Sequence, residues 1–241
     1  MKKKLALLLC LVLLVTALAL PASADNSAAW DGSVDTSWYS AEAKTFEIST
    51  PAQLAGLAAI VSGEATGIST DSFKGKTVKL TADLDLGGVK AADGTWSGPC
   101  WKPIGKNYGN AFSGTFLGGG HKISNLYFEK SLSKLTQNIG LFANIGTGGY
   151  VEGINLVSGY LHNENANTYL AGIAGINAGT IVSCHNGADV YGESYIAGIA
   201  ANASGVIVKC SNSGTIGFAG TASRGSTYGG IAAMAKNIIA N

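Results

Sequence analysis

Short apolar segments separated by glycine, asparagine and serine recur along the second half of the chain. The stretch GIAGINAGTIVSCHNGADV, which begins at Gly172, aligns with GIAANASGVIVKCSNSGTI, which begins at Gly198. Further copies start at Gly114, Gly140 and Gly230, so the starts are spaced by 26, 32, 26 and 32 residues. A period in the twenties with aliphatic residues at fixed places is typical of a solenoid, in which neighbouring units bury each other's apolar face.

The repeats have the composition of strands. Pairs and triplets such as Ile181-Val182 and Val206-Ile207-Val208 alternate with turn residues, and no amphipathic helical pattern of about ten residues occurs in them. A repeat of this length accommodates one coil of a parallel β-helix with three short strands and three turns. We expect the longer spacings to place their extra residues in polar loops at 163–168 and 217–228.

The alignment predicts two ladders of inward-facing side chains. The first contains Ile123, Val151, Ile181, Ile207 and Ile239, and the second contains Leu126, Ile154, Cys184 and Cys210. A place that accepts Leu, Ile or Cys is an apolar core position, where a free cysteine behaves as a small hydrophobic residue. Side chains stacked in register point the same way, which would strain a disulfide, so we expect buried reduced thiols.

The N-terminus has the pattern of a secretory signal peptide. Three lysines at positions 2–4 precede an apolar run from Leu5 to Leu20, and Ala22-Ser23-Ala24 forms an A-x-A cleavage site. The run is short for a membrane anchor, and no cluster of charged residues follows it. The sequence therefore predicts a secreted or extracellular protein, with residues 1–24 removed and no membrane segment left after cleavage.

A single helix is predicted ahead of the repeats. In STPAQLAGLAAIVSG, Thr50 is an N-cap, Pro51 takes the first helical position, and Gln53 completes a capping box. Leu54, Leu57, Ala58 and Val61 then follow helical spacing up to Gly63. This helix could cover the open end of the first coil, where strand edges would otherwise remain unpaired. We therefore expect a lead-in and capping helix at 25–75 and β-helix repeats at 76–241.

The last repeat looks incomplete. The copy that starts at Gly230 has its first core place at Ile239, and its second would fall just beyond Asn241. Because a β-solenoid without a terminal cap exposes unpaired backbone and apolar core, we expect further domains C-terminal to this segment in a longer chain.

Composition narrows the class of function. The chain has 34 glycines and only 4 prolines, which indicates many tight turns and no disordered linker. Removal of the signal peptide takes away three lysines and leaves a slight excess of acidic side chains, without a basic patch for nucleic acid. No cofactor motif is present: Gly75-Lys76-Thr77 lacks the upstream glycine of a phosphate-binding loop.

Catalytic and metal-binding patterns are weak. His185 follows Cys184, but Ser211 takes its place one coil later, and the three histidines occupy unlike places. Asp83 and Asp85 point the same way from one predicted strand, yet two carboxylates are too few for a Ca²⁺ site. C-x-x-C and G-x-S-x-G are both absent. We assign no catalytic residue, no metal ligand and no cofactor.

Aromatic residues gather ahead of the repeats: Trp30, Trp38, Tyr39, Trp96, Trp101 and Tyr108. Tryptophan and tyrosine rings stack on sugars and anchor interfaces. We therefore name Trp30, Trp38, Tyr39 and Trp101 as candidate glycan-stacking residues. The alternative is that these rings seal the N-terminal end of the solenoid.

The order of several motifs resembles that of the GLUG-motif proteins, which are exported bacterial repeat proteins of cell surfaces. These motifs are WDGSVDTSWY (30–39), FEISTPAQLAGLAAIV (46–61), KLTADLDL (79–86), WKPIG (101–105), FSGTFLGGGHKISNLYF (112–128) and the GIAGINAGTIVSC repeats. The resemblance implies a right-handed β-helix in a secreted or wall-associated protein. Leu117 stands where the family usually has Asp, and no shared catalytic residue comes with the motif.

Together, the residues and the resemblance predict an all-β, right-handed parallel β-helix with an N-terminal capping helix. The expected function is that of a structural or adhesive bacterial surface module, with a glycan or a cell-wall or host surface ligand as partner. One alternative is a polysaccharide-active enzyme, since β-helices host such enzymes; another is the non-catalytic part of a larger surface protease. Fold alone does not establish an activity.

Overall fold

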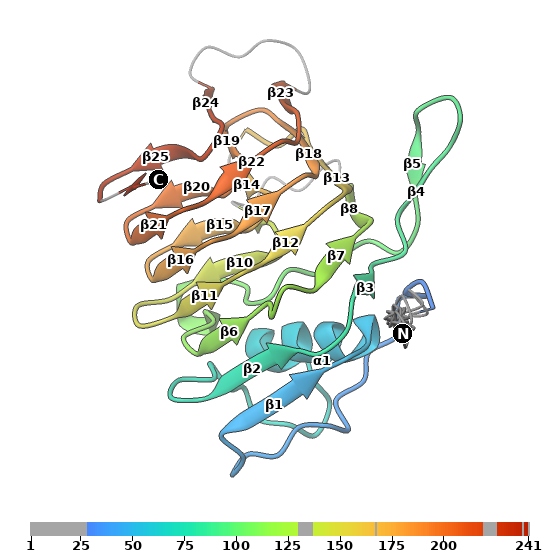
Figure 1. The fold of residues 1–241 in the computed structure, drawn as a ribbon, viewed down its shortest axis with the longest axis vertical. Helices are drawn as coiled ribbons and strands as arrows, with labels where there is room; N and C mark the ends of the chain where they lie inside the picture. Colours follow the sequence, from blue (N-terminus) through green and yellow to red (C-terminus); the bar gives the residue numbers. More distant parts are fainter. Residues whose placement is uncertain (1–27, 130–136, 167, 219–225, 238, 241) are drawn as a thin grey trace, which may run out of the picture.

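The computed structural model describes residues 28–129, 137–166, 168–218, 226–237 and 239–240, so the predicted signal peptide lies outside the described residues. Within them the chain forms a parallel β-helix with one helix, α1 (Pro51–Ser62), near its N-terminal end (Figure 1). The fold class predicted from the sequence is confirmed.

From β6 onward each complete coil passes through five parallel sheets, which we number in chain order. The first sheet contains β1 (Thr45–Ile48), β2 (Thr77–Leu80), β6 (Thr115–Leu117), β11 (Tyr150–Glu152), β16 (Thr180–Val182), β21 (Val206–Val208) and β26 (Ile239–Ala240). The second contains β3 (Leu84–Asp85), β7 (Lys122–Ser124), β12 (Asn155–Leu156), β17 (His185–Asn186) and β22 (Ser211–Asn212). The third contains β8 (Leu126–Glu129), β13 (Gly159–Asn163), β18 (Asp189–Gly192) and β23 (Ile216–Phe218).

The remaining two sheets complete the coil. The fourth contains β9 (Gln137–Ile139), β14 (Thr168–Ala171), β19 (Tyr195–Ala197) and β24 (Thr227–Gly229). The fifth contains β10 (Phe142–Ile145), β15 (Ala174–Asn177), β20 (Ala200–Ala203) and β25 (Ala232–Ala235). An antiparallel hairpin of β4 (Val89–Lys90) and β5 (Trp96–Ser97) leaves the stack between β3 and β6, and a short 3₁₀ helix follows at Tyr108–Asn110.

Each complete coil has five strands rather than the predicted three, and one of the additional corners lies between the first and second sheets. Gly153, Ser183 and Lys209 follow β11, β16 and β21 and have φ values of 67°, 51° and 53°. This left-handed conformation turns the chain sharply. Serine and lysine at this corner gave no turn signal in the sequence.

The first predicted ladder is confirmed for Val151, Ile181 and Ile207, which pair in register along the first sheet. The backbone of Ile239 continues the same register beside Ile207. Val151, Ile181 and Ile207 are fully buried. Ile123 was wrongly included: it pairs with Leu156 in the second sheet, and Phe116 takes the place beside Val151.

The second predicted ladder needs a matching correction. Ile154, Cys184 and Cys210 are buried at equivalent places, immediately after the left-handed corner. Leu126 instead pairs with Gly159 in the third sheet. The repeat predicted to start at Gly114 is out of phase with the later repeats, because Gly114 is structurally equivalent to Gly179. The carbonyl groups of both glycines accept a hydrogen bond from the first strand of the next coil. Because the turn between β6 and β7 is longer than the equivalent turns of later coils, an alignment of the repeats without gaps does not detect this shift.

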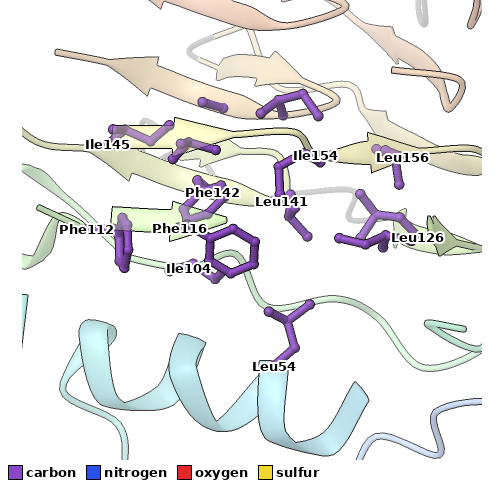
Figure 2. Packing of buried hydrophobic residues seen from close by; sticks show 14 of the residues in the cluster. Leu54, Ile104, Phe112, Phe116, Leu126, Leu141, Phe142, Ile145, Ile154 and Leu156 are labelled. Atoms are coloured by element: carbon purple, nitrogen blue, oxygen red, sulfur yellow. The ribbon is translucent and has the colours of Figure 1, made fainter. Parts of the chain in front are cut away.

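The helix closes one end of the apolar core, as predicted. Thr50 accepts a hydrogen bond from the Gln53 N–H, the glutamine side chain accepts from the Thr50 N–H, and Gly63 ends the helix in a left-handed conformation. Leu54 points from the helix toward Ile104 and Phe116 of the overlying coil (Figure 2). The helix thereby covers apolar surface that a bare first coil would expose.

A strap of residues 30–39 covers the other side of the helix. A Cβ at Gly56 would lie 2.0 Å from the Asp35 carbonyl oxygen, so this close approach requires glycine. At the end of the strap the Tyr39 hydroxyl donates to Asp71, which also pairs with the Lys76 ammonium at 2.5 Å. Both members of this ion pair are largely buried, and Lys76 also donates to the Ala41 carbonyl.

An asparagine ladder accounts for Gly172 and Gly198, two of the glycines that open a repeat. Asn186 donates to the Asn212 side chain at 2.7 Å and to the Ala188 carbonyl at 2.9 Å, inside the stack. A Cβ at Gly172 would lie 2.0 Å from the Asn186 side-chain oxygen. The glycines at these places thus make room for polar side chains that cross-link successive coils.

Cys184 and Cys210 are free thiols buried in neighbouring coils, whereas Cys100 is exposed. The Cys184 N–H donates to the Cys210 sulfur at 3.4 Å. The hydrogen bond between the two thiols and burial raise the pKa of Cys184 well above its ordinary value. The geometry agrees with the expected pair of buried reduced thiols.

Candidate functional site

The four aromatic residues named as candidates from the sequence lie at the base of the solenoid. Trp30 and Trp101 are 7% and 1% exposed, and their rings meet edge to face at 5.5 Å. Trp38 and Tyr39 are half-buried against Phe46. This packing matches the alternative in which these rings seal the end of the stack. Stacking on a sugar stays a prediction at these positions.

Trp30 and Trp101 also line a cap groove of about 510 Å³ between the strap, helix α1 and residues 99–102. Its floor is made of small side chains, Ala55, Ala58 and Ala59. Each indole N–H is already occupied: Trp30 donates to the Ser33 carbonyl and Trp101 to the Leu141 carbonyl. Neither indole N–H in this groove is therefore left to donate a hydrogen bond to a ligand.

A second depression, the hairpin groove, combines aromatic rings with charged groups. It has a volume of about 370 Å³ and lies between the β4–β5 hairpin and the outer surface of the third sheet. The hairpin projects from the stack beside β8 and β13 in Figure 1. The lining residues are Lys90, Gly94, Trp96, Tyr160, His162, Asp189, Tyr191 and Phe218.

The aromatic rings of the hairpin groove come from the hairpin and from successive coils. The Trp96 indole stacks on the Tyr160 ring with centroids 6.0 Å apart and planes 9° from parallel. The Tyr160 ring also lies 5.7 Å from the Tyr191 ring, which rests on Gly217 in the next coil. A stripe of half-exposed rings therefore runs across the strands of the third sheet.

Carboxylates surround the imidazole at one wall of this groove. His162 Nδ1 lies 3.4 Å from Glu129 Oε1, and Nε2 lies 3.8 Å from Glu164 Oε1. The second oxygen of Glu129 accepts a 2.7 Å hydrogen bond from the Tyr127 hydroxyl. Burial and this hydrogen bond raise the pKa of Tyr127 to about 12. The arrangement holds Glu129 in a fixed orientation.

The same acidic surroundings act on Tyr160. Burial, followed by the negative charges of Glu129 and Asp189 among others, raises the pKa of its hydroxyl above the ordinary value. Asp189 is fixed by the Thr215 N–H, which donates to its carboxylate at 2.9 Å. The groove can therefore place hydrogen-bond acceptors and aromatic ring faces against one ligand.

Asp83 and Asp85, the acidic pair noted in the sequence, accept hydrogen bonds from neighbouring residues. Asp83 accepts from the Lys122 N–H and contacts His121, while Asp85 accepts from the Gly87 N–H and from Asn125. Within the described ranges, no group of three or more His, Cys, Asp or Glu side chains is arranged to hold a metal ion. These two carboxylates act as turn acceptors.

Two serine hydroxyls contact His185 beside the second sheet. His185 Nδ1 lies 2.8 Å from Ser211 Oγ, and its Nε2 lies 3.0 Å from Ser213 Oγ. A nucleophile needs an oriented base and donors for an oxyanion. The Ser213 and Gly214 N–H groups both donate to the Asn186 carbonyl, so they are not available as those donors.

Sequence reasoning missed Tyr160, His162 and Tyr191 as site residues and placed no weight on the position of Trp96. Trp96 reaches Tyr160 because a hairpin folds back over a later coil, which no local pattern indicates. A signal did exist in the repeats, because tyrosines recur at outward positions of the third sheet. Tyr127 pairs with Tyr160, and His162 pairs with Tyr191.

Comparison with known proteins gives one partial match. The chain is 34% identical over 104 residues to the “Putative Gly-rich membrane protein” of Evansella cellulosilytica, a match that covers 43% of this chain and 10% of that protein. No protein-family model and no solved structure match the chain. Among the described residues, no helix has the length and apolar character needed to cross a membrane. The chain is a β-solenoid repeat protein that is similar to part of a much longer bacterial protein.

Proposed function

We propose that this chain is an exported bacterial surface module whose β-helix presents a glycan-binding groove. The groove between the β4–β5 hairpin and the third sheet carries the proposal, because Trp96, Tyr160 and Tyr191 line it together with His162 and Asp189. Aromatic faces pack against the apolar faces of sugars, and nearby polar groups fix their hydroxyls. The role is adhesive or structural, and the ligand belongs to a cell wall or a host surface.

Export and surface location rest on the N-terminal sequence and on two resemblances. Lysines at positions 2–4, the apolar run and the A-x-A site support cleavage and secretion. The motif order resembles that of the GLUG-motif surface proteins, and the partial relative is described as a membrane protein. A rigid solenoid suits such a location because it carries a binding surface on stacked coils rather than on mobile loops.

Calorimetric titration with a panel of oligosaccharides tests the proposed binding. Wild-type protein should bind at least one glycan, and Trp96→Ala should weaken that binding by about fivefold, because stacking of an aromatic ring contributes about 1 kcal/mol. Tyr108→Ala serves as the control, since Tyr108 is 74% exposed and lies outside the groove. Failure to bind any glycan of the panel, or equal loss in both variants, would contradict the proposal.

A further inference from the structure

The charged groups around the hairpin groove are mainly acidic. Asp189 and Lys90 are the carboxylate and the ammonium among the described lining residues, and the carboxylates of Glu129 and Glu164 lie beyond the lining, beside His162. All three carboxylates act on the Tyr160 hydroxyl. His162 lies between two of these carboxylates. The side chains of Glu129 and Glu164 are 43% and 51% exposed, so their charges face solvent and any ligand that enters.

These carboxylates are held at the edge of the aromatic stripe. Glu129 is oriented by Tyr127, and Asp189 by the Thr215 N–H. Each keeps lone-pair sites beyond that contact, because a carboxylate has about four of them; in Glu129 the second oxygen also faces His162. Acceptors fixed beside a ring face favour a ligand that has an apolar face and a positively charged donor at its rim.

We propose that the groove selects glycans that carry unsubstituted, positively charged amino groups over neutral or N-acylated glycans. This inference rests on the proposed glycan binding at the same groove. The sugar rings contact Tyr160 and Tyr191, while the ammonium groups approach Glu129, Glu164 and Asp189. Lys90, and His162 when it is protonated, oppose the same ligand, so the preference reflects the excess of the three carboxylates over these two groups.

Three hexasaccharides that differ at one carbon provide the test. The β-1,4-linked hexamers of glucosamine, N-acetylglucosamine and glucose carry an ammonium, an acetamide and a hydroxyl at carbon 2. Calorimetry is run in a buffer acidic enough to charge the amines while the carboxylates stay ionised. The glucosamine hexamer should bind about tenfold more tightly than the other two, and added salt should reduce the difference.

Charge-neutralising variants locate the effect. Glu129→Gln and Asp189→Asn keep the hydrogen bonds that their oxygens accept, and each should weaken glucosamine binding about threefold without changing glucose-hexamer binding. Lys90→Gln should act in the opposite direction and strengthen it. Glu47→Gln removes an equal charge from an exposed strand position outside the groove and is the control.

Two results would overturn the inference in distinguishable ways. Equal binding of all three hexamers, still lost in Trp96→Ala, would remove the charge selectivity and leave glycan binding in place. Absence of binding by all three hexamers would also overturn the inference, and absence of binding across the whole oligosaccharide panel would contradict the proposed function as well. Tetralysine is included as a further probe: if it binds as tightly as the glucosamine hexamer, the groove is a general cation site and the inference is wrong.

Discussion

The Trp96 indole and the Tyr160 phenol stack face to face, 9° from parallel, although one belongs to a hairpin and the other to a later coil. This contact joins a segment that leaves the stack to the outer surface of the third sheet. Val89 is 60% exposed, so the hairpin has little other apolar burial at this strand. The stacked pair therefore fixes the position of the hairpin and forms one wall of the groove.

Replacement of Trp96 by alanine should release the hairpin. We expect a loss of about 1 kcal/mol in the free energy of local opening, because an aromatic pair contributes about that much beyond its buried area. Hydrogen–deuterium exchange should become faster at residues 89–97 and remain unchanged in α1. Equal protection of the hairpin in wild type and variant would show that other contacts hold it.

The glycine that opens each repeat gives a matched test of the asparagine ladder. Gly172→Ala places a methyl group against the Asn186 amide and should destabilise the fold by about 2 kcal/mol. Gly230→Ala changes the equivalent place one repeat beyond Gly198, where nothing lies within 4 Å of the new Cβ. Urea unfolding should show a large difference between the two variants. Similar midpoints would contradict the close contact.

The Asp71–Lys76 pair should stabilise the base of the solenoid in a pH-dependent way. Burial alone would raise the pKa of Asp71, but hydrogen bonds from Lys76, the Phe73 N–H and Tyr39 together lower it below 3.8. A depressed folded-state pKa stabilises the protein above the unfolded-state pKa, and this contribution disappears as the pH falls through the folded-state value.

Asp71→Asn should therefore cost about 2–3 kcal/mol at neutral pH, because it leaves the Lys76 ammonium without its carboxylate partner. The difference from wild type should shrink as the pH falls below 3.8 and vanish once the pH lies below the folded-state pKa of Asp71, as followed by thermal unfolding across a pH series. Lys102→Met breaks an exposed pair with Glu64 and should change stability by less than about 0.5 kcal/mol. A difference independent of pH would rule out this ionic contribution.

The three cysteines that follow the predicted signal peptide should differ in reactivity. Because Cys100 is exposed, a maleimide reagent should label it in the native protein. Cys184 and Cys210 are buried, so they should react only after unfolding, and intact-protein mass spectrometry should find both as thiols. A mass loss of two hydrogen atoms assigned to Cys184 and Cys210 would show a disulfide and contradict this expectation.

The sequence predicted best those features that depend on local chemistry or on strict repetition. The capping box at Thr50 and Gln53 and the register from Gly172 to Gly198 both belong to this class. The register failed at Phe116 because a longer turn between β6 and β7 shifts the phase. The groove could not be foreseen because it depends on the hairpin meeting Tyr160, a contact set by the path of a chain insertion over later coils.

The most direct test is to map ligand contacts on the protein by NMR. Backbone amide shifts are followed during titration with the glucosamine hexamer, under the same conditions as calorimetry. Shifts confined to residues 89–97, 127–129, 160–162 and 189–191 would support glycan binding in the hairpin groove. Shifts centred on Trp30 and Trp101 at the cap groove, or no shifts at all, would contradict it.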